Sequence, residues 1–138
     1  MKNVLVLCTA NSCRSQIADG YLKHYSRGKA NIYSAGTQKS HVNLRAIATM
    51  QRDGIDISQH TSNDLSEYKD MPFDYVITVC DEAKESCPVF PGEGKKIHKG
   101  FVDPAKMKGS EEKINSEFDR VRSEIKTFCK EFCAKYIL

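Results

Sequence analysis

The sequence lacks the features that mark membrane-embedded, exported and disordered proteins. Its 138 residues contain no apolar run near the ~20 residues that a membrane helix requires, and the apolar run near the start is too short for a signal peptide. The composition, 40% hydrophobic and 28% charged, is ordinary for a soluble globular chain and too apolar for a disordered one. We therefore expect a cytoplasmic protein without a membrane partner.

The sequence also lacks internal repeats, low-complexity stretches and linkers rich in glycine, serine or proline. Residues 1–138 are therefore expected to form a single domain. An excess of one charge is missing as well, because the net charge is only +3. This small charge gives no basis for nucleic acid as a partner, although it is compatible with a small anion.

Apolar runs and helical periodicity alternate along the chain. Strands are expected at three continuous apolar runs and one shorter segment, residues 3–7, 31–35, 75–79 and 96–99. Helices are expected from the spacing of apolar residues over 16–25, 44–52 and 111–136. Gly28 and Gly54 stand where the first two helices would end. This order predicts a doubly wound α/β sheet of about four parallel strands flanked by helices, which binds ligands beyond the carboxyl ends of its strands.

The loop after the first strand carries the strongest chemical signal. It reads Cys8-Thr9-Ala10-Asn11-Ser12-Cys13-Arg14-Ser15, with five residues between Cys8 and Arg14. A loop of this length can curl its backbone N–H groups around one point, where the start of the next helix and the Arg14 guanidinium add positive charge. Such a cradle binds a tetrahedral oxyanion, and the same field favours a thiolate on Cys8. The alternative is that Cys8 only ends a buried strand as a small hydrophobic residue.

The other residues of this loop, Thr9 to Ser15, are expected to bind the oxyanion or to support the loop. Ser15 can cap the helix or donate its hydroxyl to the Cys8 thiolate. Asn11 can hold the loop together or adopt a left-handed turn. Cys13 is either a packing thiol or an oxidation partner of Cys8, and packing is favoured.

The six cysteines need individual explanations, because thiols in a reducing compartment are more often catalytic, redox-active or metal-binding than structural. Cys80 ends the third predicted strand, so it should emerge at the same edge of the sheet as Cys8, and Cys87 follows after six residues. The polar segment between Cys80 and Cys87 lacks apolar anchors, so it should open at modest cost. Alternatives are a buried strand-end thiol or half of a zinc site, but no second Cys/His pair has zinc-ligand spacing. Cys129 and Cys133 share a face of the last helix and are expected to pack there.

These motifs resemble those of a known family. The strand ending in Cys8 and its loop are similar to the low-molecular-weight tyrosine phosphatase superfamily, and the whole chain is most similar to its thioredoxin-coupled arsenate reductases. Further shared motifs cover nearly the whole length: Tyr33-Ser34-Ala35-Gly36, Ile55-Asp56-Ile57-Ser58, His60-Thr61-Ser62 and Phe101-Val102-Asp103-Pro104-Ala105. At Ala10 the family usually has glycine, so the backbone there is expected to be more restricted.

The resemblance implies that the protein reduces arsenate to arsenite. Cys8 attacks arsenate to form a Cys8–arsenic adduct, while Arg14 and the loop hold the oxygens. Asp103 matches the family's general acid and protonates the departing oxygen, although spacing alone makes this Asp-Pro pair a turn. Cys80 then attacks Cys8 and releases arsenite, and Cys87 attacks Cys80 to leave a disulfide that thioredoxin reduces. The expected protein is a monomer, with phosphate or sulfate as competing oxyanions and glutaredoxin as the alternative reductant.

Two other functions remain open. Cys8, Arg14 and Asp103 suffice for a phosphomonoester phosphatase that works through a phospho-cysteine. Phosphatases of this superfamily tend to follow Asp-Pro with aromatic residues, whereas this chain has Ala105-Lys106-Met107. The second alternative is a non-enzymatic thiol sensor that oxidises at Cys8 and signals through a partner.

No tightly bound cofactor is expected. Some family members bind potassium near the oxyanion loop, and the matching positions are Asn11, Asp19, Ser34, Thr61 and Asn63. Asp19 and Asn63 replace the usual Glu and Asp, which shortens one carboxylate and removes one charge from this cation site. The four histidines are scattered and are expected to be surface or capping residues.

Overall fold

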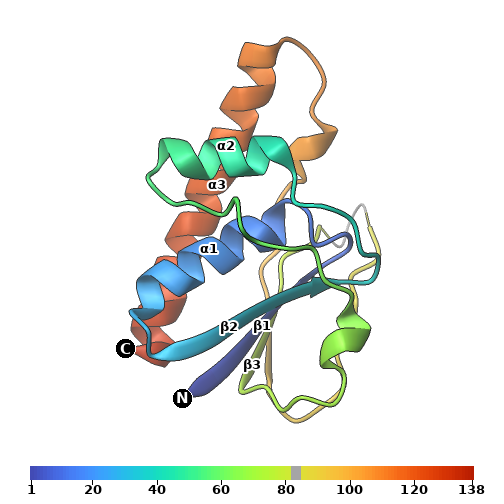
Figure 1. Ribbon diagram of the computed structural model, residues 1–138, viewed down its shortest axis with the longest axis vertical. Coiled ribbons are helices and arrows are strands. Elements are labelled where there is room, and N and C mark those ends of the chain that lie inside the picture. The colour runs from blue at the N-terminus through green and yellow to red at the C-terminus, as the bar shows by residue number, and fades with distance from the viewer. Residues whose placement is uncertain (82–84) are drawn as a thin grey trace.

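The computed structural model describes residues 1–81 and 85–138, and its centre is a parallel sheet (Figure 1). The strands are β1 (Lys2–Cys8), β2 (Ala30–Gly36), β3 (Tyr75–Thr78) and β4 (Lys95–His98). They lie in the order β2-β1-β3-β4, and each neighbouring pair is parallel. The expected sheet of four parallel strands is confirmed, and each predicted strand end lies within one residue of the observed end.

β1 is the buried centre of this sheet, because it pairs with β2 on one side and β3 on the other. Its residues Val4 to Leu7 are fully buried. Val4 and Val6 pack into one hydrophobic cluster, and Leu5 and Leu7 into another. The continuous apolar run is therefore explained by a strand whose two faces are both covered.

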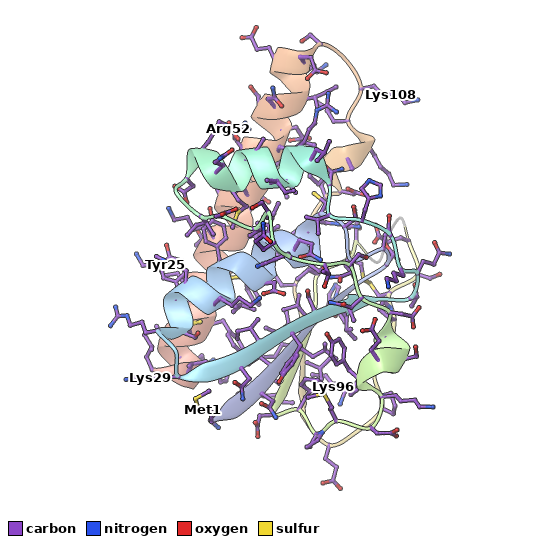
Figure 2. The ribbon with its side chains drawn as sticks, in the orientation of Figure 1. Met1, Tyr25, Lys29, Arg52, Lys96 and Lys108 are labelled. Atoms are coloured by element: carbon purple, nitrogen blue, oxygen red, sulfur yellow. A yellow bond between two sulfur atoms is a disulfide. The ribbon has the colours of Figure 1, made fainter. Side chains whose placement is uncertain are left out.

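The α-helices cover one face of the sheet (Figure 1). They are α1 (Arg14–Ser26), α2 (Leu44–Arg52) and α3 (Glu111–Phe132). Their apolar side chains pack with Val4 and Val6 to form the main core. Figure 2 shows side chains between the helices and the sheet. None of the helices formed by residues 1–81 and 85–138 is long and apolar enough to cross a membrane.

The opposite face is covered by aromatic side chains on a short 3-10 helix, η1 (Leu65–Tyr68), and on loops. Phe73 makes edge contacts with Tyr33, Tyr68 and Phe90, at ring-centroid separations of 5.6, 6.3 and 5.5 Å. Rings of this size cover the apolar sheet without a long helix.

The helix ends agree with the sequence in part. Gly28 and Gly54 lie two residues after the ends of α1 and α2 and have positive φ angles of 76° and 77°, as expected for residues that follow a helix end. The last helix was expected to continue to residue 136, but α3 ends at Phe132 and a π-helical turn, Cys133–Ile137, follows. The widened turn is held by the Leu138 amide, which donates to the Cys133 carbonyl at 2.8 Å.

Cys129 and Cys133 both lie in the main core, as expected for packing residues. Their sulfur atoms lie 3.7 Å from the Ala18 carbonyl and 3.9 Å from the Leu22 carbonyl of α1. Burial raises the pKa of Cys129 well above its usual range and that of Cys133 to about 11. Both thiols are therefore protonated and help to join α3 to α1.

The strand order changes direction at β1, whose chain neighbour β2 lies on one side while β3 and β4 lie on the other. In sheets of this kind, the crevice at the carboxyl ends of the strands flanking this point is the place where ligands bind. Cys8 ends β1, and Cys80 comes two residues after β3. Both cysteines thus flank the expected ligand crevice.

Candidate active site

The loop between β1 and α1, residues 8–15, is called the oxyanion loop below. Its turn is made at Asn11, where φ is 49°. The Asn11 side chain donates to Ser15 Oγ at 2.8 Å and accepts from the Asn63 amide at 2.8 Å. Asn11 therefore adopts the left-handed conformation and also holds the loop together, so both predicted roles are confirmed. Ala10 is not among the positive-φ residues, and alanine therefore fits where the family usually has glycine.

The carbonyl groups of this loop are bound by donors from outside it. The Thr9 and Ala10 carbonyls accept from the Gln38 amide at 3.0 Å and the Ser62 hydroxyl at 3.0 Å. The carbonyls of the next two residues, Asn11 and Ser12, accept from Gln16 Nε2 at 3.0 Å and the Asn43 amide at 2.9 Å. Four successive carbonyls are thus held by donors from outside the loop, and these bonds fix the loop's backbone in place.

The loop encloses a small pocket suited to a tetrahedral oxyanion. The pocket has a volume of about 170 Å³ and is lined by Cys8, Thr9, Ala10, Asn11, Ser12, Cys13, Arg14, Ser40, Asp103 and Ala105. Arg14 is 3% exposed, and its Nε has no hydrogen-bond partner in residues 1–81 and 85–138. A buried donor of this kind calls for an acceptor, and an oxyanion is one that fits the pocket.

Asp103 reaches this pocket from the segment that follows β4. The Phe101 amide donates to the Val79 carbonyl at 3.2 Å, and the Phe101 carbonyl accepts from Arg14 Nη1 at 3.1 Å. These bonds bring Asp103 Oδ2 to 3.7 Å from Arg14 Nη2. Cys8, Arg14 and Asp103, which are far apart in the sequence, therefore meet at one pocket.

Cys80 and Cys87 form a disulfide beside the same edge of the sheet. Cys80 is fully buried, and the preceding Val79 amide donates to the carbonyl of Leu7, the residue before Cys8. The expected opening of the intervening segment concerns residues 82–84, which lie outside the described part of the chain. The pairing of Cys80 with Cys87, which the family resemblance implied, is present.

The structure bears on the alternative roles that the sequence left open for Ser15 and Cys13. No side chain caps the start of α1, so the capping role of Ser15 is wrong. Its hydroxyl oxygen accepts from Asn11 instead, and donation to Cys8 stays a prediction. Cys13 is 6% exposed within the main core, where burial strongly raises its pKa, as expected for a packing thiol.

Cys8 is less acidic in this state than the sequence predicted. The expectation was a thiolate at neutral pH, but burial raises the pKa of Cys8. Arg14 and hydrogen bonds from Thr9 act in the opposite direction, and the charge of Glu85 adds to the increase. The thiol form of Cys8 is therefore favoured while Glu85 lies beside Arg14.

This pKa predicts the pH dependence of Cys8 alkylation in the disulfide-bonded protein. Iodoacetamide reacts with the thiolate, so its rate should rise about tenfold per pH unit from about pH 7 to about pH 9, without a plateau. Modification of the Cys8 peptide is followed by mass spectrometry, with the urea-unfolded chain as the control. A rate that levels off below about pH 9 would contradict the assignment.

Gly36 is a supporting residue whose role the sequence did not indicate. A Cβ at this position would lie 2.4 Å from the Thr9 carbonyl oxygen and 2.8 Å from the Asn11 amide. Both neighbours are backbone atoms of the oxyanion loop, so they cannot move aside as a side-chain end can.

Gly36→Ala should weaken phosphate binding at least about tenfold and destabilise the fold by ~1–3 kcal/mol, because the added methyl displaces the loop. Titration calorimetry and urea unfolding measure the two effects. Gly20→Ala is the control, since its methyl would meet side-chain atoms rather than backbone: Ile57 and Met50, each at 2.9 Å, and Ile55 at 3.5 Å. Equal loss of phosphate affinity in both variants would contradict a specific role for Gly36.

The residues matched to the family's potassium site do not fit the ion. Four of them line one cavity of about 190 Å³: Asp19, Ser34, Thr61 and Asn63. Lys23 Nζ lies 2.9 Å from Asp19 Oδ1 and already supplies a positive charge. The Asn63 carbonyl oxygen Oδ1 accepts from the Thr61 hydroxyl, and Asn11 Oδ1 accepts from the Asn63 amide. These oxygens are therefore engaged within the protein, and no step below involves potassium.

Comparison with known proteins finds similarity over nearly the whole chain. The sequence profile described as "Low molecular weight phosphotyrosine protein phosphatase" matches residues 3–136. An arsenate reductase of Bacillus licheniformis is 43% identical over 131 residues, which cover 95% of this chain and 94% of that protein. Arsenate reductase 2 of Staphylococcus epidermidis is 44% identical over 131 residues, with 95% of each chain covered. A solved structure described as "An arsenate reductase in the phosphate binding state" has a TM-score of 0.77 and 31% identity, and covers 100% of both chains.

Proposed function

The chain belongs to the low molecular weight phosphotyrosine protein phosphatase family, and on this premise we propose that it is an arsenate reductase. The observation that carries the proposal is the Cys80–Cys87 disulfide at the sheet edge where Cys8 and Arg14 lie. A hydrolase that works through a phospho-cysteine needs no second or third thiol. Relatives that are 43% and 44% identical to the chain are arsenate reductases, which supports the same conclusion.

The first step joins arsenic to Cys8. The Cys8 sulfur attacks arsenate, Arg14 and the N–H groups of the oxyanion loop hold the oxygens, and one As–O bond breaks. Asp103, which lines the pocket, donates the proton with which that oxygen leaves as water. The product is a Cys8–arsenic adduct in which arsenic is still pentavalent.

The second step transfers two electrons to arsenic. The Cys80 thiolate attacks the sulfur of Cys8, an S–S bond forms, and the electron pair of the S–As bond stays on arsenic, which leaves as arsenite. The Cys87 thiolate then attacks Cys80 and displaces Cys8 as a thiolate. Two thiols have become one disulfide, Cys80–Cys87, which is the bond present in the structure.

Thioredoxin is the reductant that we propose for this disulfide. Thiol–disulfide exchange with a dithiol protein returns Cys80 and Cys87 to thiols and completes the cycle. This cycle requires a reducing compartment, so we propose that the protein acts in the cytoplasm. We also propose that the protein acts as a monomer.

Phosphomonoester hydrolysis is a secondary activity supported by the same pocket. Cys8, Arg14 and Asp103 are the groups that a phospho-cysteine mechanism uses. None of the described residues that line the pocket is aromatic, so an aryl phosphate would gain little binding from its ring.

The test follows NADPH consumption in a mixture of the protein, arsenate, thioredoxin and thioredoxin reductase. Many equivalents of NADPH per protein chain are expected, because one disulfide is reduced at the expense of NADPH in every cycle. Replacing thioredoxin by glutathione and glutaredoxin identifies the reductant. Consumption of no more than about one equivalent would instead indicate a thiol sensor, which reacts only once.

A further inference from the structure

Glu85 engages the arginine that an oxyanion would use. Its Oε1 lies 2.8 Å from Arg14 Nη2 and its Oε2 lies 3.0 Å from Arg14 Nη1, so the carboxylate grips the guanidinium with both oxygens. Oε1 also accepts a hydrogen bond from Thr9 Oγ1 at 3.2 Å. The side chains of Arg14 and Glu85 are 3% and 14% exposed, so this pairing is largely shielded from water. An oxyanion that binds Arg14 in the same two-pronged way must displace Glu85.

Glu85 reaches Arg14 from beside the oxyanion pocket. It lines an adjoining cavity of about 220 Å³, and Asp103 lines both this cavity and the oxyanion pocket. The Arg14 guanidinium therefore has two carboxylates near it, one from Glu85 and one from Asp103 at 3.7 Å. The Glu85 carboxylate offsets the single positive charge of Arg14, so a multiply charged oxyanion is attracted less strongly while Glu85 is in place.

The position of Glu85 is linked to the redox state of the protein. Glu85 lies within the ring closed by the Cys80–Cys87 disulfide, two residues before Cys87. Cys80 is fixed at the end of β3 and fully buried, and the Phe90 side chain after the ring is 5% exposed in the second core. The disulfide leaves Glu85 fewer conformations to lose when it binds Arg14. It therefore raises the effective concentration of the Glu85 carboxylate near Arg14. Reduction removes this restriction.

We propose that Glu85 competes with oxyanions for Arg14, and that it does so more strongly when Cys80 and Cys87 are disulfide-bonded. The proposal rests on the arsenate reductase function, in which this disulfide forms and is reduced in every cycle. Arsenate that reached Cys8 before the disulfide was reduced would find no free thiol to complete its reduction. Glu85 thus disfavours arsenate binding until the relay cysteines are thiols. The raised pKa of Cys8, to which Glu85 contributes, lowers its reactivity in the same state.

Thermodynamic linkage gives this proposal a second measurable consequence. If the disulfide weakens anion binding, then a bound anion must destabilise the disulfide by the same factor. Phosphate should therefore make the reduction potential of the Cys80–Cys87 couple less negative, by about 30 mV for each tenfold difference in affinity.

The experiment uses inorganic phosphate, which these thiols do not reduce, and measures its affinity by titration calorimetry for the reduced and the disulfide-bonded chain. The native protein should bind phosphate at least about tenfold more tightly when reduced. In Glu85→Gln the phosphate affinities of the reduced and disulfide-bonded forms should agree within about twofold, mainly because the disulfide-bonded form gains affinity. Glu93→Gln makes the same charge change at a residue that lines neither cavity of the site, and it should behave as the native protein does.

Equal affinities in the two native forms, or an unchanged ratio in Glu85→Gln, would overturn the proposal. Should Glu85→Gln fold poorly, the native protein decides the matter alone, because saturating phosphate either shifts the reduction potential or leaves it in place. Neither readout depends on arsenate turnover. Arsenate turnover without redox-linked phosphate binding would refute only the role proposed for Glu85. Redox-linked phosphate binding without arsenate turnover would refute only the proposed function.

Discussion

Cys80→Ser is expected to abolish repeated arsenate reduction in the thioredoxin-coupled assay, while hydrolysis of an aryl phosphate stays within about threefold of the native rate. A serine hydroxyl at this position cannot displace arsenic from the Cys8 sulfur or form a disulfide with Cys87. The adduct on Cys8 can still form, because Arg14 and Asp103 are unchanged. NADPH consumption and release of a chromogenic phenol measure the two activities.

Two further variants separate the steps of the relay. Cys87→Ser leaves Cys80 able to release arsenite once, so about one arsenite per chain should appear and Cys8 should remain in a Cys8–Cys80 disulfide. Cys133→Ala removes a buried thiol that packs against the Leu22 carbonyl of α1, so repeated turnover should survive. Continued turnover by Cys80→Ser would remove the basis for the relay, because arsenic would then be reduced without the Cys80 thiol.

The parts of this site that could be predicted from sequence are those fixed by local pattern. The apolar run of β1 indicates a strand covered on both faces, and it places Cys8 at the carboxyl end of the central strand. The following helix start and Arg14 then make an anion site, because the positive end of α1 adjoins the strand end. Asp103 needed the family resemblance, since an Asp-Pro pair by itself is only a turn signal.

The supports of the oxyanion loop could not be predicted in this way. Its carbonyls are held by Gln38 and Asn43, which lie between β2 and α2, and by Ser62, which lies after α2. Such polar residues are common in loops, so no periodicity or spacing marks the ones that turn a carbonyl outward. Only the folded chain brings these donors to the loop.

The acidity of Cys8 was mispredicted for a related reason. The sequence shows the groups that favour a thiolate, namely the helix start and Arg14, because they are neighbours of Cys8 in the chain. It does not show the depth of burial or the approach of Glu85, which lies 71 residues after Arg14. Both of these raise the pKa, and burial has the largest effect.

Arg14 has to serve two different anions in this scheme, and geometry decides how well it can do so. Its two terminal nitrogens bind the Glu85 carboxylate, and its buried Nε is left for an acceptor in the oxyanion pocket. A planar fork can exchange one two-pronged partner for another with little rearrangement. A lysine ammonium has the same charge but no fork, so it cannot hold an oxyanion and its transition state in one orientation.

Arg14→Lys is therefore expected to lower kcat/KM for arsenate by about 10²–10³-fold, the usual cost of losing an oriented oxyanion donor. Hydrolysis of an aryl phosphate should fall by a similar factor, because both reactions begin with attack of Cys8 on a tetrahedral anion at this pocket. The control is Arg27→Lys, at the exposed end of α1, which makes the same substitution away from the site and should retain native kcat/KM. A loss of less than about threefold in Arg14→Lys would show that charge alone suffices, and the two-pronged role assigned to Arg14 would be wrong.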